Sequence, residues 1–201
     1  MIWWLKARRV RSVVLGGLGL FLVALAVLQD AVVDLPSFVT SSANPVLFVL
    51  MAPVPVCAAL MTALESRLAE AEETGTRNVP LLDAALILAT VASAVAVGGV
   101  LGLAVDSGAA QAAGRNVAFL TGLMLCVRTV AGSTAVMAPV GWIFAVIFLA
   151  LPGQGRADLW AVLPEPAGHA PAAVASATAL AAGLALHLTL GSRNGERPHV
   201  P

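Results

Sequence analysis

Long apolar runs separated by short polar stretches are the feature that most constrains this sequence. One run extends from Leu81 to Val105, and others reach from Ser12 to Leu28 and from Pro45 to Leu64. A helix needs about 20 predominantly apolar residues to cross the hydrocarbon core of a bilayer. Only 11% of the 201 residues are charged, whereas charged residues make up roughly a quarter of an ordinary soluble domain. We therefore expect a small polytopic membrane protein rather than a soluble globule.

The polar breaks divide the chain into predicted membrane helices. The stretch from Asn116 to Leu151 is too long for one crossing, and we expect it to fold back at Gly132, Ser133 and Thr134. The predicted fold class is all-α, with residues 1–201 forming a single transmembrane domain of six spans. These spans are 12–28, 46–64, 81–105, 116–132, 135–151 and 172–190.

Basic residues fall almost entirely on one side of the predicted spans. With the N-terminus inside, only Arg115 and Arg156 of the 11 basic residues lie outside. Because cytoplasmic loops carry an excess of Lys and Arg, we predict that both termini are cytoplasmic. The use of Arg in place of Lys, with Lys6 as the only lysine, and the abundance of alanine indicate a GC-rich bacterial genome, so we expect a bacterial cell membrane. An alternative is that the basic start and the first apolar run form a signal peptide.

Several chemistries are excluded or disfavoured by the residues available. A phosphate-binding GxxxxGK[ST] loop needs a lysine after its second glycine, and Lys6 follows Leu5. Cys57 and Cys126 stand in apolar runs without a second Cys or a His at ligand spacing, so we predict buried thiols and no metal site. The basic residues do not cluster as nucleic-acid binding requires. We therefore expect a chain that is not an enzyme and has no nucleic-acid partner.

A few intramembrane residues leave alternatives open. Ser133 and His187 could form the couple of an intramembrane serine protease, but Ser133 lacks the GxSG spacing that rhomboid proteases use. Arg128 lies within snorkelling reach of the inner turn, and a role in substrate handling is the alternative. Gly98 and Gly102 have the GxxxG spacing typical of close helix packing.

The densest charge in the sequence lies in the stretch 65–80. Residues Ala63 to Glu73 are strong helix formers, and Gly75 stands where such a helix would end. Leu64 and Leu68 are one turn apart, so a short cytoplasmic helix would present a small apolar edge beside acidic residues. This pattern indicates docking to a partner. The alternative is a solvated extension of the second span.

This organisation resembles the permeases of the type-2 ABC exporter family. The likeness rests on the six predicted spans with both termini inside, the basic amphipathic start and the charged loop after span two. It also rests on the pair Arg115 and Asn116 and on the Pro/Trp-rich stretch from Leu159 to Pro164. The chain is short for the family, and its loop lacks the family's glycine-threonine-leucine-glutamate run and its threonine-proline pair.

The resemblance implies a function and partners. The coupling loop 65–80 would dock on a separate ABC ATPase subunit, which binds ATP and Mg, so this chain itself would hold no cofactor. The resemblance also implies a re-entrant outer segment at 152–171, and a second permease copy or a related permease as partner. We therefore expect the membrane-spanning permease subunit of an ATP-driven exporter with an amphipathic substrate. The expected ATPase-facing residues are Glu65, Arg67, Glu70, Glu72, Glu73 and Arg77.

The alternative function is a small secondary carrier or a non-transporting membrane partner protein. The sequence Met51-Ala52-Pro53-Val54 in span two recurs from Met137 to Val140 in span five. These are equivalent positions of a three-plus-three inverted repeat, in which proline-broken helices mark transport sites. Against a carrier, we expect no Asp or Glu well inside a span that could carry coupled protons or sodium.

Overall fold

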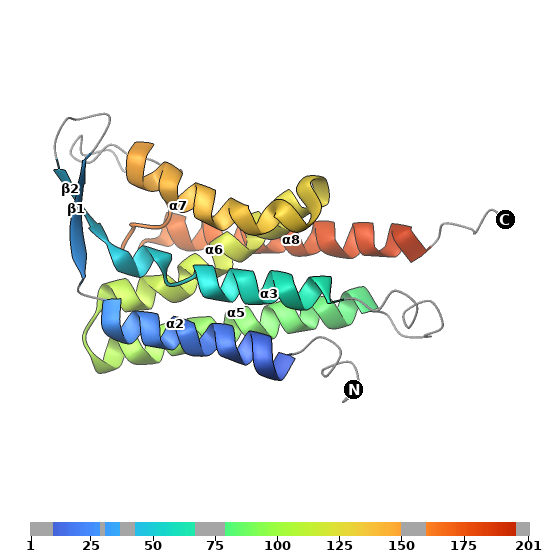
Figure 1. Cartoon of the computed structure of the whole chain (residues 1–201), viewed down its shortest axis with the longest axis horizontal. Helices are drawn as coiled ribbons and strands as arrows, with labels where there is room; N and C mark the ends of the chain where they lie inside the picture. The colour runs from blue at the N-terminus through green and yellow to red at the C-terminus, as the bar shows by residue number, and fades with distance from the viewer. Residues whose placement is uncertain (1–9, 29–30, 37–42, 67–78, 150–159, 196–201) are drawn as a thin grey trace.

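The computed structural model describes residues 10–28, 31–36, 43–66, 79–149 and 160–195. Most of these residues are helical, and the helices follow a common long axis, with each reversing the direction of the one before (Figure 1). The helical elements are η1 (Val10–Val14), α2 (Leu15–Leu28), η2 (Phe48–Met51), α3 (Val54–Glu65), α5 (Val79–Ala104), α6 (Gly108–Ala131), η3 (Gly132–Val136), α7 (Met137–Leu149) and α8 (Ala170–Gly195).

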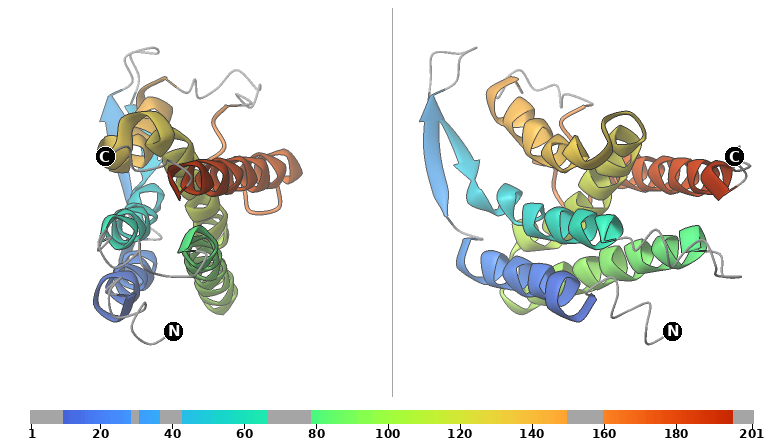
Figure 2. Two further views of the ribbon diagram at one scale, coloured as in Figure 1. Left: turned by 90° about the vertical axis from the view of Figure 1, so that its right-hand side faces the viewer. Right: turned by 45° about the vertical axis from the view of Figure 1, so that its right-hand side comes forward.

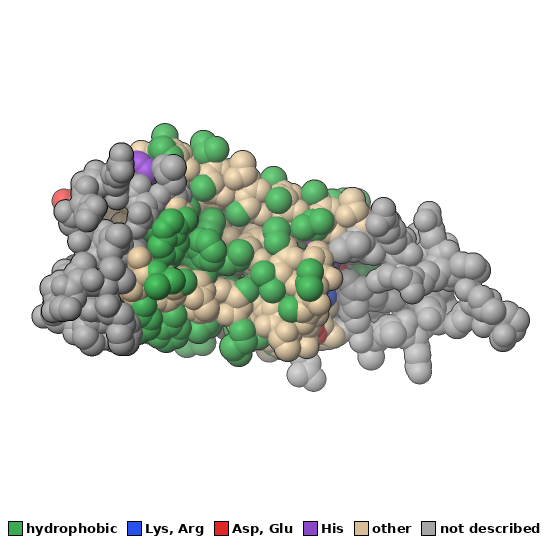
Figure 3. All heavy atoms as spheres, turned by 90° about the horizontal axis from the view of Figure 1, so that it is seen from above, with side chains coloured by type: hydrophobic (Ala, Val, Ile, Leu, Met, Phe, Trp, Pro, Cys, Tyr) green, Lys and Arg blue, Asp and Glu red, His purple; other side chains and the backbone are tan. Residues whose placement is uncertain are grey.

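Four helical stretches among the described residues are long and apolar enough to cross a membrane. They are Phe48–Glu65, Val79–Ala104, Gly108–Leu149 and Ala170–Thr189, and a shorter apolar helix covers Ser12–Leu28. At 1.5 Å per residue, α5 is about 39 Å long, which exceeds the hydrocarbon core of about 30 Å. Figure 3 shows apolar side chains across the middle of one face, with few charged ones. The chain thus has the apolar helices of a membrane-embedded protein.

The longest apolar stretch, Gly108–Leu149, turns back on itself. Gly132 ends α6 with a φ of 58°, in the left-handed region that favours glycine, and its N–H donates to the carbonyl of Arg128. The 3-10 helix η3 then leads into α7, which returns along α6 (Figure 1). The reversal therefore lies at the residues where the sequence predicts it.

The connection between α5 and α6 is shorter than the sequence predicts. Helix α6 begins at Gly108, whereas the sequence analysis expects a polar loop up to Arg115 and a span from Asn116. The Ser107 hydroxyl oxygen caps the helix by accepting a hydrogen bond from the Ala110 N–H at 3.3 Å. Alanine dominates the first turns of α6, and its high helix propensity explains why this stretch joins the helix.

A two-stranded antiparallel ladder lies at one end of the bundle, where the sequence analysis expects a loop and the start of span two. Strand β1 (Val32–Pro36) pairs with β2 (Ala43–Leu47), with Val32 opposite Leu47. Helix α3 begins only at Val54, with Pro53 as N-cap and Pro55 in the first turn, where a helix leaves backbone N–H groups unpaired and proline is tolerated. The bundle is helical, as predicted, and the ladder adds one β element to it.

Glycines allow α5, α6 and α8 to pack closely. A Cβ on Gly98 would lie 2.9 Å from the carbonyl oxygen of Ala110, inside contact distance. A Cβ on Gly183 of α8 would lie 2.6 Å from the carbonyl oxygen of Gly122 of α6. The predicted packing role of the GxxxG spacing that begins at Gly98 is therefore confirmed. Helix α8 crosses the other helices obliquely, as the end-on view in Figure 2 shows.

The apolar core lies between the helices. Large side chains such as Phe21, Leu60, Ile87 and Leu120 are completely buried there. Cys57 is also buried and lies 3.8 Å from the hydroxyl oxygen of Thr121, measured from its sulfur. It packs as the small buried residue that the sequence predicts, whereas Cys126 is only partly buried.

Candidate functional site

The predicted docking stretch lies mostly outside the described residues. Helix α3 ends at Glu65, whose side chain is exposed, and the Ser66 N–H donates to the carbonyl of Thr62 at 3.1 Å. Helix α5 begins at Val79 at the same end of the bundle (Figure 1). Of the six predicted contact residues, only Glu65 lies within the described part of the chain. The other five lie outside the described residues: Arg67, Glu70, Glu72, Glu73 and Arg77.

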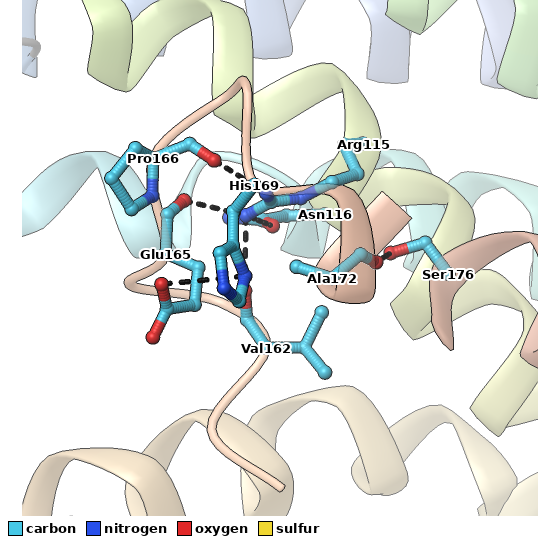
Figure 4. A network of polar contacts seen from close by, with 8 residues as sticks. All are labelled: Arg115, Asn116, Val162, Glu165, Pro166, His169, Ala172 and Ser176. Atoms are coloured by element: carbon cyan, nitrogen blue, oxygen red, sulfur yellow. Dashed lines mark hydrogen bonds and ion pairs between the residues drawn. The ribbon is translucent and has the colours of Figure 1, made fainter. Parts of the chain in front are cut away.

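A polar network that the structure does describe lies at the opposite end. It joins Arg115 and Asn116 of α6 to residues 160–169, which we name the connecting segment (Figure 4). This segment contains turns but no helix or strand, and it leads directly into α8. Because α6 begins at Gly108, Arg115 and Asn116 lie in its second and third turns rather than at the predicted start of span four.

Arg115 binds three backbone carbonyls of the connecting segment. Its Nη1 donates to the carbonyl of Pro166 at 2.8 Å. Its Nη2 donates to the carbonyls of Val162 at 2.9 Å and Glu165 at 2.7 Å. The same Nη2 lies 3.2 Å from Oδ1 of Asn116. One half-buried guanidinium thus gathers a curved stretch of backbone around itself, which its fork of donors suits better than an ammonium would.

Asn116 binds a fourth carbonyl of the connecting segment from the buried side. Its side chain is 2% exposed, and its Nδ2 donates to the carbonyl of Leu163 at 2.9 Å. The apolar side chains of Ala161, Val162 and Leu163 are buried against the helices. Non-helical backbone is tolerated among apolar surroundings only where its polar groups are satisfied. Arg115 and Asn116 meet that requirement for four carbonyls, and we call this pair the carbonyl clamp.

Aromatic rings support the same segment from α7. The ring of Trp142 lies 5.5 Å from that of Phe119 on α6 and 6.2 Å, edge to face, from that of Trp160 in the connecting segment. Two donors in this cluster, Nε of Arg115 and Nε1 of Trp142, are buried without an acceptor among the described residues. A buried donor left unpaired costs about 1–3 kcal/mol.

One ion pair lies at the edge of the network. Nδ1 of His169 is 3.4 Å from a carboxylate oxygen of Glu165, one turn earlier in the chain. Both side chains are partly exposed to solvent, at 34% and 21% respectively. The pair carries attraction only when His169 is protonated, and exposed pairs contribute about 0–1 kcal/mol. The carbonyl clamp, rather than this pair, therefore holds the segment.

Asp83 is a buried polar residue that the sequence analysis missed. It lies in the second turn of α5 and is 0% exposed, so a carboxylate is buried near the end of a span, although the sequence analysis expects none well inside one. Its spacing could have revealed it, because Asp83, Ile87, Thr90 and Ala94 form one buried face. Ionisable residues inside membrane helices are expensive to bury and usually functional.

The remaining singled-out residues lie toward the other end of the bundle. Arg128 occupies the last turn of α6, where a cation interacts favourably with the helix dipole. Ser133 is exposed in η3, and His187 is partly buried in α8. Among the described side chains, no three His, Cys, Asp or Glu residues gather as a metal site would require.

Comparisons with protein families, with characterised proteins and with solved structures give no match for this chain. The arrangement itself must therefore indicate the function. Its chemistry is that of holding a backbone segment across the ends of apolar helices, through one guanidinium and one amide.

Proposed function

We propose that this chain is the membrane-spanning permease subunit of an ATP-driven ABC exporter in a bacterial cell membrane. ATP hydrolysis with Mg would take place on a separate ATPase subunit. A second copy of the chain, or a related permease, would complete the path for an amphipathic substrate. The proposal assigns six crossings to η1 with α2, η2 with α3, α5, α6, α7 and α8.

The observation that carries this proposal is that the two ends of the bundle differ in charge. The start of η1, the end of α3, the start of α5, the turn at η3 and the end of α8 lie together at one end (Figure 1). The charged stretch 67–78 joins α3 to α5 there. Because basic residues in the sequence concentrate at this end, we assign it to the cytoplasm. The carbonyl clamp and the ladder of β1 and β2 then lie at the outer end.

The two ends differ in what they offer a partner. The α5–α6 turn at the outer end is short, and the connecting segment is fastened to the helices. The inner end carries the charged stretch with three of its acidic residues at Glu70, Glu72 and Glu73. A soluble subunit that drives transport from the cytoplasm would therefore find its contact at the inner end.

Reversing the charge at each end tests the proposal with a matched control. A tagged chain with Glu70→Lys, Glu72→Lys and Glu73→Lys is compared with one carrying Asp30→Lys, Asp34→Lys and Asp106→Lys. Each is captured from cells of its source, and the captured material is labelled with a photoreactive azido-ATP. We expect a labelled subunit with the unaltered chain and the second variant, but not with the first. A labelled subunit in none of the three, or in all three equally, contradicts the proposal.

The buried carboxylate of Asp83 favours a second candidate, a proton-coupled or sodium-coupled carrier. The repeated Met-Ala-Pro-Val sequence supports it only at one of its two sites. Pro53 lies at the break between η2 and α3 within one crossing, whereas Pro139 lies in the first turn of α7. The two candidates differ in energy source. Uptake of a fluorescent amphipathic dye into proteoliposomes, driven by an ion gradient without ATP and abolished by Asp83→Asn, would favour the carrier.

A further inference from the structure

The side-chain hydrogen bonds that fasten the connecting segment to α6 are concentrated at one place. Among the described residues, the hydrogen bonds that α6 donates to its carbonyls come from Arg115 and Asn116, and at the junction with α8 the Ala173 N–H donates to the carbonyl of His169 at 3.2 Å. The backbone bonds within the segment are local, from Val162 N to the Trp160 carbonyl and from His169 N to the Pro166 carbonyl. The segment also packs through the buried side chains of Val162 and Leu163 and through the ring of Trp160. A short segment with so few attachments can open locally while the helices around it stay folded.

The packing of α6 on α8 is separate from this fastening. The two helices meet at Gly122 and Gly183, where each glycine leaves no space for a Cβ against the other helix. These contacts lie two turns beyond Arg115 along α6. Detachment of the connecting segment would therefore leave the contact between α6 and α8 in place.

The fastened arrangement also leaves two buried hydrogen-bond donors without an acceptor among the described residues. Nε of Arg115 and Nε1 of Trp142 are buried and lack acceptors among the described residues, although both side chains belong to the contact surface of the segment. Detachment exposes both donors to water or to new acceptors, which offsets part of the hydrogen bonding that is lost. The fastened and detached arrangements are therefore closer in free energy than the number of clamp bonds suggests.

We propose that the connecting segment is a strap that opens locally, and that Arg115 and Asn116 are the positioning residues that hold it closed. In the exporter proposed above, opening would uncover the outer end of the path between the helices, and this role rests on the proposed function. The opening itself requires neither an ATPase nor a substrate, so it is tested on the purified full chain.

Cysteine labelling measures the opening directly. Ala161 is 5% exposed, and cysteine is only slightly larger than alanine, so Ala161→Cys reports on the segment in a Cys57→Ala, Cys126→Ala background. Ala94 in the middle of α5 is 0% exposed, and Ala94→Cys reports on the bundle. Each reporter chain, reconstituted in lipid nanodiscs, is reacted with a maleimide that does not enter membranes. Nanodiscs leave both faces accessible, so the result is independent of orientation in the cell.

We expect Arg115→Gln to raise the labelling rate at residue 161 by about tenfold or more, because several charge-assisted hydrogen bonds are lost. Asn116→Ala, which removes one bond, should raise it less. Labelling at residue 94 should stay at the unaltered rate in both. Arg128→Gln, at the other end of α6, is the matched control and should change neither rate.

Three outcomes would overturn the proposal. If the rate at residue 161 does not rise in Arg115→Gln, the clamp does not hold the segment. If the rates at residues 161 and 94 rise together, or if the variant is not inserted at all, the segment opens only when the bundle unfolds. If Arg128→Gln has the same effect as Arg115→Gln, the opening is not controlled by the clamp. None of these outcomes affects the azido-ATP experiment on the proposed exporter.

Discussion

The contact between α6 and α8 makes a strong prediction about Gly122. A Cβ at this position would collide with the backbone carbon of Ala179 and the nitrogen of Leu180, and would lie 2.5 Å from the carbonyl oxygen of Ala179. Ordinary contact begins at 3.4 Å, so α8 would have to move by at least the difference from 2.5 Å, 0.9 Å, to admit one methyl group. These neighbours are backbone atoms, which cannot turn aside as a flexible side chain can.

The expected magnitude follows from a comparison with Gly99. A Cβ on Gly99 of α5 meets nothing within 4 Å. Replacing either glycine with alanine inside a helix gains about 1 kcal/mol of helix propensity. Gly122→Ala carries in addition the cost of overpacking, about 1–3 kcal/mol. The gain in helix propensity is the same for both variants and cancels in the difference between their free energies of unfolding. Gly122→Ala should therefore be less stable than Gly99→Ala by about 1–3 kcal/mol.

The free energy of unfolding of both variants can be measured in mixed micelles by titration with SDS, with helix content followed by far-ultraviolet circular dichroism. The unaltered chain provides the reference for each. If Gly122→Ala proves as stable as Gly99→Ala, α6 and α8 are not in backbone contact. The close packing of α8 on α6 described above would then be refuted.

Two further predictions concern the buried side chain of Asp83 and the orientation of the chain in the membrane. Asp83→Asn should change the free energy of unfolding by about 1–3 kcal/mol, because the side chain is completely buried, whereas the exposed Asp106→Asn should change it by less than about 0.5 kcal/mol. Equal stability of the two would contradict a structural role for the buried carboxylate. In intact cells, a membrane-impermeant maleimide should label Gly168→Cys but should label Thr74→Cys only after permeabilisation. The opposite pattern would reverse the assigned orientation.

Much of the helical architecture is predictable because the apolar runs are long and their breaks are strongly polar. The reversal at Gly132 is visible because a run from Asn116 to Leu151 exceeds one crossing and contains a turn signal. The packing role of Gly98 and Gly102 follows from their spacing alone. These features depend on local composition and on helix geometry, which a single sequence contains.

Other features differ from the prediction, either because local signals conflict or because contacts between distant residues decide them. The start of α6 at Gly108 was missed because Gln111 and Arg115 appear polar in the sequence, although alanine and the Ser107 cap favour a helix there. The sequence showed the pair Arg115 and Asn116, but not that they bind carbonyls some fifty residues away. The spacing of Asp83 with Ile87, Thr90 and Ala94 indicates that it shares their face, but its complete burial depends on the helices packed against that face.

The proposed docking of an ATPase subunit at the inner end is tested most directly by site-specific photo-cross-linking in living cells. The photoreactive residue p-benzoylphenylalanine is placed at Ala71, in the charged stretch, or at Gly108, which is exposed at the opposite end of the bundle. We predict that Ala71 gives one cross-linked product containing a protein that binds azido-ATP, and that Gly108 gives none. The absence of that product from Ala71, or its appearance from Gly108 instead, would contradict the account.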